Sequence, residues 1–288
     1  MTESLLTFPK GGVHPPEYKE LTEHLAIENF PTPEELDILL IQHFGAPCEP
    51  LAKKKDKVSE GDLIGQVESG LGANIHSRVT GTVKNIGSSA NAVSVTSPAI
   101  TLKTDPEAQP KEYTPSDWKE LSRDELLSRV KRAGIVGIGG AGFPTHVKLN
   151  PPPEAKVDTL IINGAECEPY LTTDHRVMRE HAQEVVEGTK IILAILGIDA
   201  CHIGIESNKM DAIEVMSKAA KEASSEGFNI SVDALEVKYP QGSEKQLIQS
   251  VMGRKVPGFG LPFDVGLIVQ NVGTTKAIYD AVAVSYTH

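Results

Sequence analysis

Two short segments of the chain carry residue types that could bind a phosphorylated cofactor. The first, "GIGGAGFPTHVK" at residues 137–148, has four glycines in six positions and ends in a lysine. Consecutive backbone N–H groups can surround an anion where the chain adopts unusual φ angles and no Cβ blocks the approach. Lys148 adds a full positive charge. The segment therefore predicts a phosphate-binding loop, and the alternative is a glycine-rich turn with a solvated lysine.

The second segment, "INGAECEPYLTTD" at residues 162–174, combines an amide, two carboxylates and a thiol. It follows the apolar run "DTLIIN" (158–163), and open α/β sheets bind ligands at the carboxyl ends of their strands. An acidic side chain at such a strand end can accept hydrogen bonds from ribose hydroxyls. The alternative is an exposed acidic turn, which accounts for the charges but not for a proline-fixed loop directly after a buried strand.

The glycine segment is not an ordinary dinucleotide fingerprint, although Gly137, Gly139 and Gly142 match the pattern G-x-G-x-x-G. That fingerprint follows a strand and opens a helix. Here the glycines follow a helix predicted over 122–133, and Pro144 interrupts the start of the next one. The context therefore disfavours an ordinary Rossmann loop.

The predicted secondary structure differs on the two sides of residues 104–117. This stretch is proline-rich and acidic, and we interpret it as a linker. Before it, short β-type runs separated by glycine turns predict a β-rich module over 1–103. The runs from "VSEGDLIGQVE" to "IHSRVTGTVKNI" resemble the barrel-sandwich fold of biotinyl and lipoyl carrier domains. Their turn "SGLGAN" lacks the modified lysine of the carriers, so we expect a docking module instead of a swinging arm.

After the linker, apolar strands alternate with amphipathic helices, which predicts an α/β layer with a largely parallel sheet over 118–284. A long helix is expected over 174–196 with Asp174 as its N-cap, and its two histidines, His175 and His181, are expected to be solvated. Ser122 and Ser243 each begin a capping-box pattern at a helix start. The predicted strands are 158–163, 201–206, 229–237 and 265–271.

The composition excludes several classes of protein. A formal charge of −11 argues against a nucleic-acid surface. Three widely separated cysteines with no Cys-x-x-Cys spacing exclude a self-contained zinc ribbon or four-cysteine iron–sulfur site and fit a reducing compartment. Neither a signal peptide nor a membrane span is recognised in the sequence, so we expect a cytoplasmic protein that could dock on a membrane partner.

The two segments together resemble the FMN- and NADH-binding subunit of respiratory complex I and, more closely, the C-subunit of the Rnf electron-transport complex. "GGVHPPE" (11–17) and "KYPQGSEKQLI" (238–248) also fit the Rnf C-subunit, and the resemblance runs from about residue 10 to about 283. It implies a Rossmann-like FMN/NADH-binding domain of the complex I flavoprotein type after a barrel-sandwich-like module. Hydride would pass between NAD(H) and FMN, so no catalytic acid, base or metal ligand is expected.

The resemblance also implies a role for individual residues. Positions matching the family's NAD(H) contacts are Phe143, Glu168 and Glu244. Those matching its FMN contacts are Gly137, Gly139, Gly140, Gly142, Lys148, Asn163, Glu166, Tyr239, Gly242, Gln270 and Asn271. Two positions depart from the complex I pattern, since Ile138 replaces an arginine and Ser243 a glutamate. Cys167 is interpreted either as a redox thiol beside the flavin or as a small, partly buried hydrophobe.

The C-subunit of the Rnf family continues into a ferredoxin-like domain with two [4Fe–4S] clusters, so the resemblance implies a chain truncated before that region. Residues 285–288 are then expected to be a foreign tail. The implied partners are the other Rnf subunits, membrane and iron–sulfur subunits included, and indirectly ferredoxin, on the cytoplasmic face of the cell membrane. Two alternatives stay open: an FMN-containing cobalamin reductase of a microcompartment, and a non-catalytic docking scaffold with a vestigial cofactor site.

Overall fold

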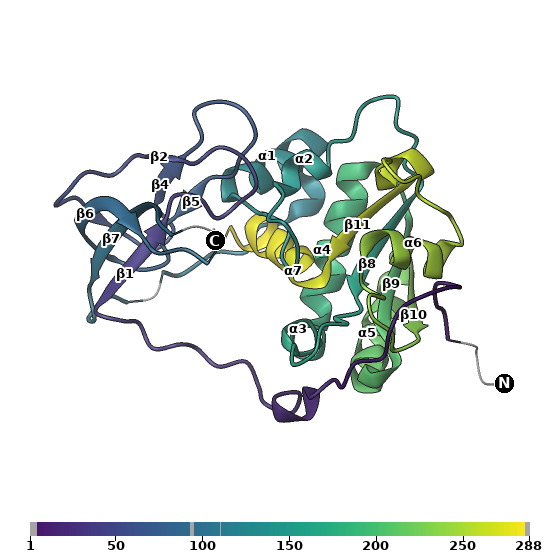
Figure 1. The fold of residues 1–288 in the computed structure, drawn as a ribbon. Helices are drawn as coiled ribbons and strands as arrows, with labels where there is room; N and C mark the ends of the chain where they lie inside the picture. Colours follow the sequence, from purple (N-terminus) through teal and green to yellow (C-terminus); the bar gives the residue numbers. More distant parts are fainter. Residues whose placement is uncertain (1–4, 93–94, 110, 286–288) are drawn as a thin grey trace. The chain divides into compact units, whose positions relative to one another are not determined.

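A computed structural model describes residues 5–92, 95–109 and 111–285 (Figure 1). These residues form two compact units. The α/β unit joins the described residues up to Ile27 with Leu149–Tyr279, and the β-rich unit joins Glu28–Lys148 with the described residues from Asp280 onward. The division differs from boundaries drawn at 103 and 118 in two ways. It assigns the N-terminal segment to the α/β unit, and it assigns residues 118–148 to the β-rich unit. The tail expected at 285–288 lies outside the described residues, apart from Ser285.

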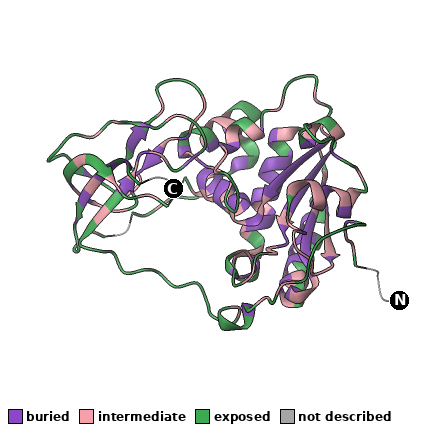
Figure 2. Ribbon diagram, in the orientation of Figure 1, coloured by how far each residue is buried: buried purple, intermediate pink, exposed green. Residues whose placement is uncertain are grey.

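The α/β unit is built on a four-stranded parallel sheet. Its strands, in spatial order, are β10 (Asn229–Leu235), β9 (Ala200–Glu206), β8 (Thr159–Gly164) and β11 (Leu267–Asn271). Ile162 of β8 is paired with Ile203 of β9 and Gln270 of β11. Every residue of β8 except Asn163 is buried (Figure 2). Such continuous burial is expected of a parallel strand that is covered on both faces, and it explains the unbroken apolar run "TLII".

Helices cover this sheet on both faces. They are α3 (Thr173–Glu180), α4 (Ala182–Leu196), α5 (Met210–Ser224), α6 (Glu244–Met252) and α7 (Val272–Tyr279), with short helical turns η1 (Lys19–Leu21), η3 (Ser207–Lys209) and η4 (Pro262–Val265). Leu247 and Ile248 of α6 pack in one cluster with Ile161 and Val269 of the sheet. Helices α3, α4, α5 and α7 pack against one another. The predicted Rossmann-like layer is therefore confirmed.

The long helix predicted over 174–196 is two helices. The chain leaves helical geometry at His181, where φ is −130°, and α4 begins at the next residue. The prediction of Asp174 as N-cap was also wrong, because α3 already begins at Thr173. His175, expected to be solvated, is 3% exposed. A charged sequence pattern around a histidine does not reveal that its face of the helix is turned inward.

The β-rich unit contains two antiparallel sheets that share one core. The first sheet has the order β1 (Glu35–Leu39), β7 (Ser97–Thr104), β6 (Gly81–Ser89), β3 (Lys57–Val58), and the second has the order β2 (Glu49–Pro50), β4 (Leu63–Gln66), β5 (Ile75–His76). Ile38, Ile100 and Leu102 from the first sheet meet Ile64 and Ile75 from the second. This arrangement confirms the predicted barrel-sandwich-like module.

The β-rich unit also contains η2 (Trp118–Glu120), α1 (Arg123–Ala133), the short α2 (Thr145–Lys148) and the π-helical turn η5 (Asp280–Val284). The Ser122 side chain accepts a hydrogen bond from the Glu125 N–H, so it caps α1 as predicted. The same prediction for Ser243 was wrong. Its hydroxyl bonds to the Gln246 side chain, and no side-chain cap on α6 is formed within the described residues. In that same part of the chain, no helix is long and apolar enough to cross a membrane.

Candidate cofactor site

The glycine segment forms a closed loop between α1 and α2. An isolated bridge joins Val136 to Pro144, and the Gly137 N–H donates to the Phe143 carbonyl over 2.9 Å. Gly139 and Gly142 have φ angles of +74° and +64°, which L-residues with a side chain rarely adopt. Two of the four glycines are therefore required by the backbone of the loop itself.

The other two glycines, Gly137 and Gly140, lack a positive φ. A Cβ placed at Gly140 would meet no described atom within 4 Å, and one at Gly137 would make ordinary contact with Phe143 at 3.7 Å. Neither conformation nor packing within the described residues calls for glycine at position 140. A bare, exposed backbone beside open space is what a ligand needs for close approach, so the loop fits a phosphate-bearing cofactor.

The loop is anchored to the β-rich unit, of which it is a part. The Phe44 N–H donates to the Gly142 carbonyl over 2.9 Å, and the rings of Phe44 and Phe143 lie 6.1 Å apart. A Cβ at Gly142 would come within 3.3 Å of the His43 backbone. Phe143 is half-buried and Lys148, the last residue of α2, is also partly exposed. The predicted residues from 137 to 148 therefore belong to the β-rich unit.

The remaining predicted residues belong to the α/β unit, where a group of them meets at the carboxyl end of β8. The Asn163 amide donates to the Gly242 carbonyl over 2.8 Å. The side chain of Tyr239 is hydrogen-bonded to Glu168, and the negative charge of that carboxylate raises the pKa of the phenol. A Cβ at Gly242 would lie 3.3 Å from Ala165 and 3.5 Å from Asn163 and Cys167, so the cluster is closely packed around this glycine. Residues 163–168 and 239–242 thus form one cluster.

Glu166 has a different position from the one expected of a ligand contact. Its carboxylate accepts hydrogen bonds from the N–H groups of Asp174 (2.6 Å) and His175 (3.3 Å) at the start of α3. The carboxylate therefore caps that helix and stabilises its positive end. Its own backbone has φ of +49°, a costly conformation for glutamate. The Glu166 side chain thus shapes the loop that follows β8.

The end of β11 supplies the predicted amides. Gln270 is 3% exposed, and Asn271 donates to the Asp174 carboxylate over 2.7 Å while accepting from the Thr274 N–H at 3.1 Å. Burial, then the charge of Glu166, raises the pKa of Asp174 to about 7. Glu244, the first residue of α6, is partly exposed.

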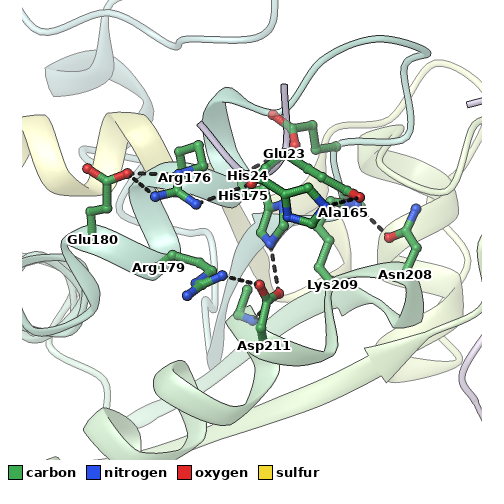
Figure 3. Close-up of polar contacts among 12 residues, drawn as sticks. Glu23, His24, Ala165, His175, Arg176, Arg179, Glu180, Asn208, Lys209 and Asp211 are labelled. Atoms are coloured by element: carbon green, nitrogen blue, oxygen red, sulfur yellow. Dashed lines mark hydrogen bonds and ion pairs between the residues drawn. The ribbon is translucent and has the colours of Figure 1, made fainter. Parts of the chain in front are cut away.

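Sequence reasoning missed a buried lysine next to this cluster. Lys209 is 1% exposed and donates to the Ala165 carbonyl (2.8 Å), the Asn208 side chain (2.8 Å) and Glu206 (3.3 Å), as Figure 3 shows in part. Desolvation lowers the pKa of Lys209 and raises that of Glu206. Glu206 and Lys209 lie three positions apart in the sequence, a spacing that suits an ion pair, but nothing in the pattern shows that both are buried. Lys19 is a second buried lysine that sequence reasoning missed.

Two side chains of α3 near the cluster contact the neighbouring helix α5. His175 bonds to Asp211 over 2.8 Å, and Arg179 contacts the same carboxylate, so both stabilise the packing of α3 on α5 (Figure 3).

Cys167 is half-buried, and burial raises the pKa of its thiol. The sulfur accepts a weak hydrogen bond from the Gly242 N–H at 3.4 Å. Among the described residues no group of three His, Cys, Asp or Glu side chains could hold a metal ion.

This chain belongs to the family described as the Nuo51 FMN-binding domain, whose model matches residues 130–280. A second family model, the RnfC barrel sandwich hybrid domain, matches residues 6–107. The matched ranges cover both the glycine loop and the strand-end cluster.

Relatives of the chain carry a more specific description. The chain is 47% identical over 275 residues to the C-subunit of the proton-translocating ferredoxin:NAD(+) oxidoreductase complex of Clostridium ljungdahlii, covering 95% of this chain and 59% of the relative. It is 42% identical to the C-subunit of the Na(+)-translocating ferredoxin:NAD(+) oxidoreductase complex of Acetobacterium woodii, covering 94% and 61%. The chain therefore spans about three-fifths of the length of these curated relatives.

A solved structure shares the fold. The H2-reduced NAD+-reducing [NiFe]-hydrogenase matches 58% of this chain and 32% of its own chain, with a TM-score of 0.52 and 24% identity. The likeness supports the α/β architecture described above.

Proposed function

We propose that this chain is the flavoprotein part of an electron-transfer subunit that exchanges hydride between NAD(H) and bound FMN. The observation that carries the proposal is the match of residues 130–280 to an FMN-binding domain family, since it includes a glycine loop whose backbone is open at Gly140. FMN, when bound, supplies the two-electron chemistry. The protein's own task is to hold the phosphate, orient the two rings and exclude water.

The proposed FMN contacts are the glycine loop, Lys148, Asn163, Tyr239, Gly242 and the amides Gln270 and Asn271. Glu166 acts indirectly in this proposal, because its carboxylate already caps α3. For NAD(H) we propose Phe143, Glu168 and Glu244. Phe143 offers a partly exposed ring, and a carboxylate such as Glu168 can accept hydrogen bonds from ribose hydroxyls.

We further propose that the complete protein acts in an ion-translocating ferredoxin:NAD+ oxidoreductase of the Rnf type, on the cytoplasmic face of the membrane. The names of the relatives support this role. Its partners would be the other Rnf subunits, with ferredoxin reached through iron–sulfur centres outside the present residues.

The test is to incubate the purified chain with FMN, remove the excess, and record the flavin spectrum anaerobically before and after NADH. We expect stoichiometric flavin that NADH bleaches. Folded protein without flavin would rule out the cofactor assignment. Flavin that NADH leaves oxidised would instead support a vestigial nucleotide site, the docking-scaffold alternative.

A further inference from the structure

The N-terminal segment 5–27 is attached to the edge of the parallel sheet. An isolated parallel bridge joins Leu6 to Leu235 at the end of the edge strand β10, and an antiparallel bridge joins Val13 to Tyr239 through two hydrogen bonds of 2.8 Å (Figure 1). The segment therefore pairs with the carboxyl end of the edge strand and with the chain that follows it. It leads from there to the loop that follows β8.

Lys19 fixes that loop through its ammonium group. Nζ donates to the carbonyl oxygens of Glu166 (2.8 Å), Glu168 (3.0 Å) and Leu171 (2.6 Å). A lysine ammonium has three N–H donors, and all three are used here. The residue is 4% exposed, so its charge depends on these acceptors for compensation.

Neighbouring residues of the same segment contact the same loop. The Tyr170 N–H donates to the Glu17 carbonyl over 2.8 Å, and the rings of Tyr18 and Tyr170 stack at 5.0 Å. The hydroxyls of Thr22 and Thr172 lie 2.8 Å apart. Contacts therefore follow the loop along its length.

The loop is one that needs such support. Glu166 and Tyr170 have φ of +49° and +68°, which cost non-glycine residues energy and persist only where surrounding contacts fix them. A second lysine, Lys209, donates to the carbonyl of Ala165, the residue directly before Glu166. Two buried ammonium groups, one of them 147 residues upstream of Glu166, therefore hold the backbone from which the side chains of Glu166 and Glu168 project.

We propose that Lys19 is a positioning residue of the cofactor site, and that segment 5–27 is a functional part of the α/β unit. The Lys19 side chain reaches the predicted cofactor contacts only through the backbone of the loop. Its loss would leave three carbonyl oxygens without their donor, and the strained loop would open. The inference rests on the proposed function for its ligand, but its first readout needs no ligand.

The experiment compares Lys19→Met with the matched control Lys10→Met in the full chain, since Lys10 is an exposed lysine of the same segment. Amide hydrogen exchange is measured without ligand. We expect exchange of the amides in 166–172 to accelerate at least about tenfold in Lys19→Met while the strands β8 and β9 stay protected. The dissociation constant for FMN should rise about tenfold, as for the loss of one charged hydrogen bond.

Unchanged exchange in 166–172 would overturn the inference, whatever the flavin does. Thr22→Val serves as the second variant, because it removes a partly buried hydroxyl contact to the same loop and leaves Lys19 in place. If Lys19→Met loses protection throughout the sheet, Lys19 supports the fold and not the loop alone, which overturns its positioning role. Thr22→Val then tests the remaining part of the proposal: local acceleration at 166–172 supports segment 5–27 as a support of the loop, and no acceleration refutes it. Failure of the wild-type chain to retain FMN would sink the proposed function while leaving the exchange result to judge Lys19.

Discussion

Asp174 is a carboxyl group that folding pushes toward its neutral form. Burial and the nearby Glu166 raise its pKa to about 7 from an ordinary value of 3.8. The folded protein therefore holds a proton there between about pH 4 and 7 that the unfolded chain releases. Stability from this group is present at low pH and is lost as the pH rises through that window.

We expect Asp174→Asn to be more stable than the wild type at pH 8 by about 2–4 kcal/mol, since one pKa unit corresponds to about 1.4 kcal/mol. The asparagine keeps an acceptor for Asn271. The gain should shrink steadily toward pH 4. Urea unfolding of both proteins at several pH values measures it, and a difference that does not vary with pH would contradict the assignment.

Gly140 is the residue that most sharply tests the phosphate loop. Gly140→Val should abolish FMN retention, because the new side chain would occupy the open space over the backbone, while the unfolding midpoint changes little. Gly258→Val is a matched control, since a Cβ there also meets no described atom within 4 Å.

Glu168→Gln should keep FMN and weaken reduction by NADH. Equal loss of flavin in the Gly140 and Glu168 variants would refute the division of roles.

At the scale of elements, the two helices that begin with serine differ in how they start. Ser122→Ala removes a side-chain acceptor for the Glu125 N–H and should cost about 1 kcal/mol of unfolding free energy. Ser243→Ala removes only a bond to the Gln246 side chain and should cost less than about 0.5 kcal/mol. Denaturant unfolding of the pair measures both. Equal losses would show that the local hydrogen bond does not govern α1.

Helix α3 connects the cofactor-site loop to the sheet. Its first N–H groups bond to Glu166, and Asp174 in its first turn bonds to Asn271 at the end of β11. The loop after β8 and the end of β11 are therefore coupled through one short helix. The sequence predicted a continuous helix over 174–196 because its apolar periodicity carries across His181.

At the scale of the whole molecule, the residues proposed for FMN fall in both compact units. We expect FMN to slow hydrogen exchange in the loop 137–143 of the β-rich unit and in residues 163–168 of the α/β unit. Exchange with and without FMN, using Gly140→Val as the control that cannot bind, measures both segments. A segment that FMN does not protect would contradict the contacts proposed for that segment.

The fold class and the four strands of the parallel sheet could be predicted from the sequence, and the two segments proposed to bind cofactor were recognisable in it, because these depend on local patterns. The apolar period gives the strands, and clustered glycines or carboxylates are visible in the sequence directly. Glycine permits φ > 0 but does not reveal where it occurs, since Gly139 and Gly142 have it and Gly137 and Gly140 do not.

The roles of Lys19, Lys209 and Glu166 depend on long-range contacts that the folded chain creates. Lys19 meets the loop after β8 across 149 residues of chain, and its burial comes from elements that no local pattern relates. A lysine in a sequence is interpreted as solvated because burying its charge is costly. For Lys19, three backbone carbonyl oxygens offset that cost. Every residue has a backbone carbonyl, so the sequence does not mark these three. They can bind one ammonium group only because the fold brings them to one point.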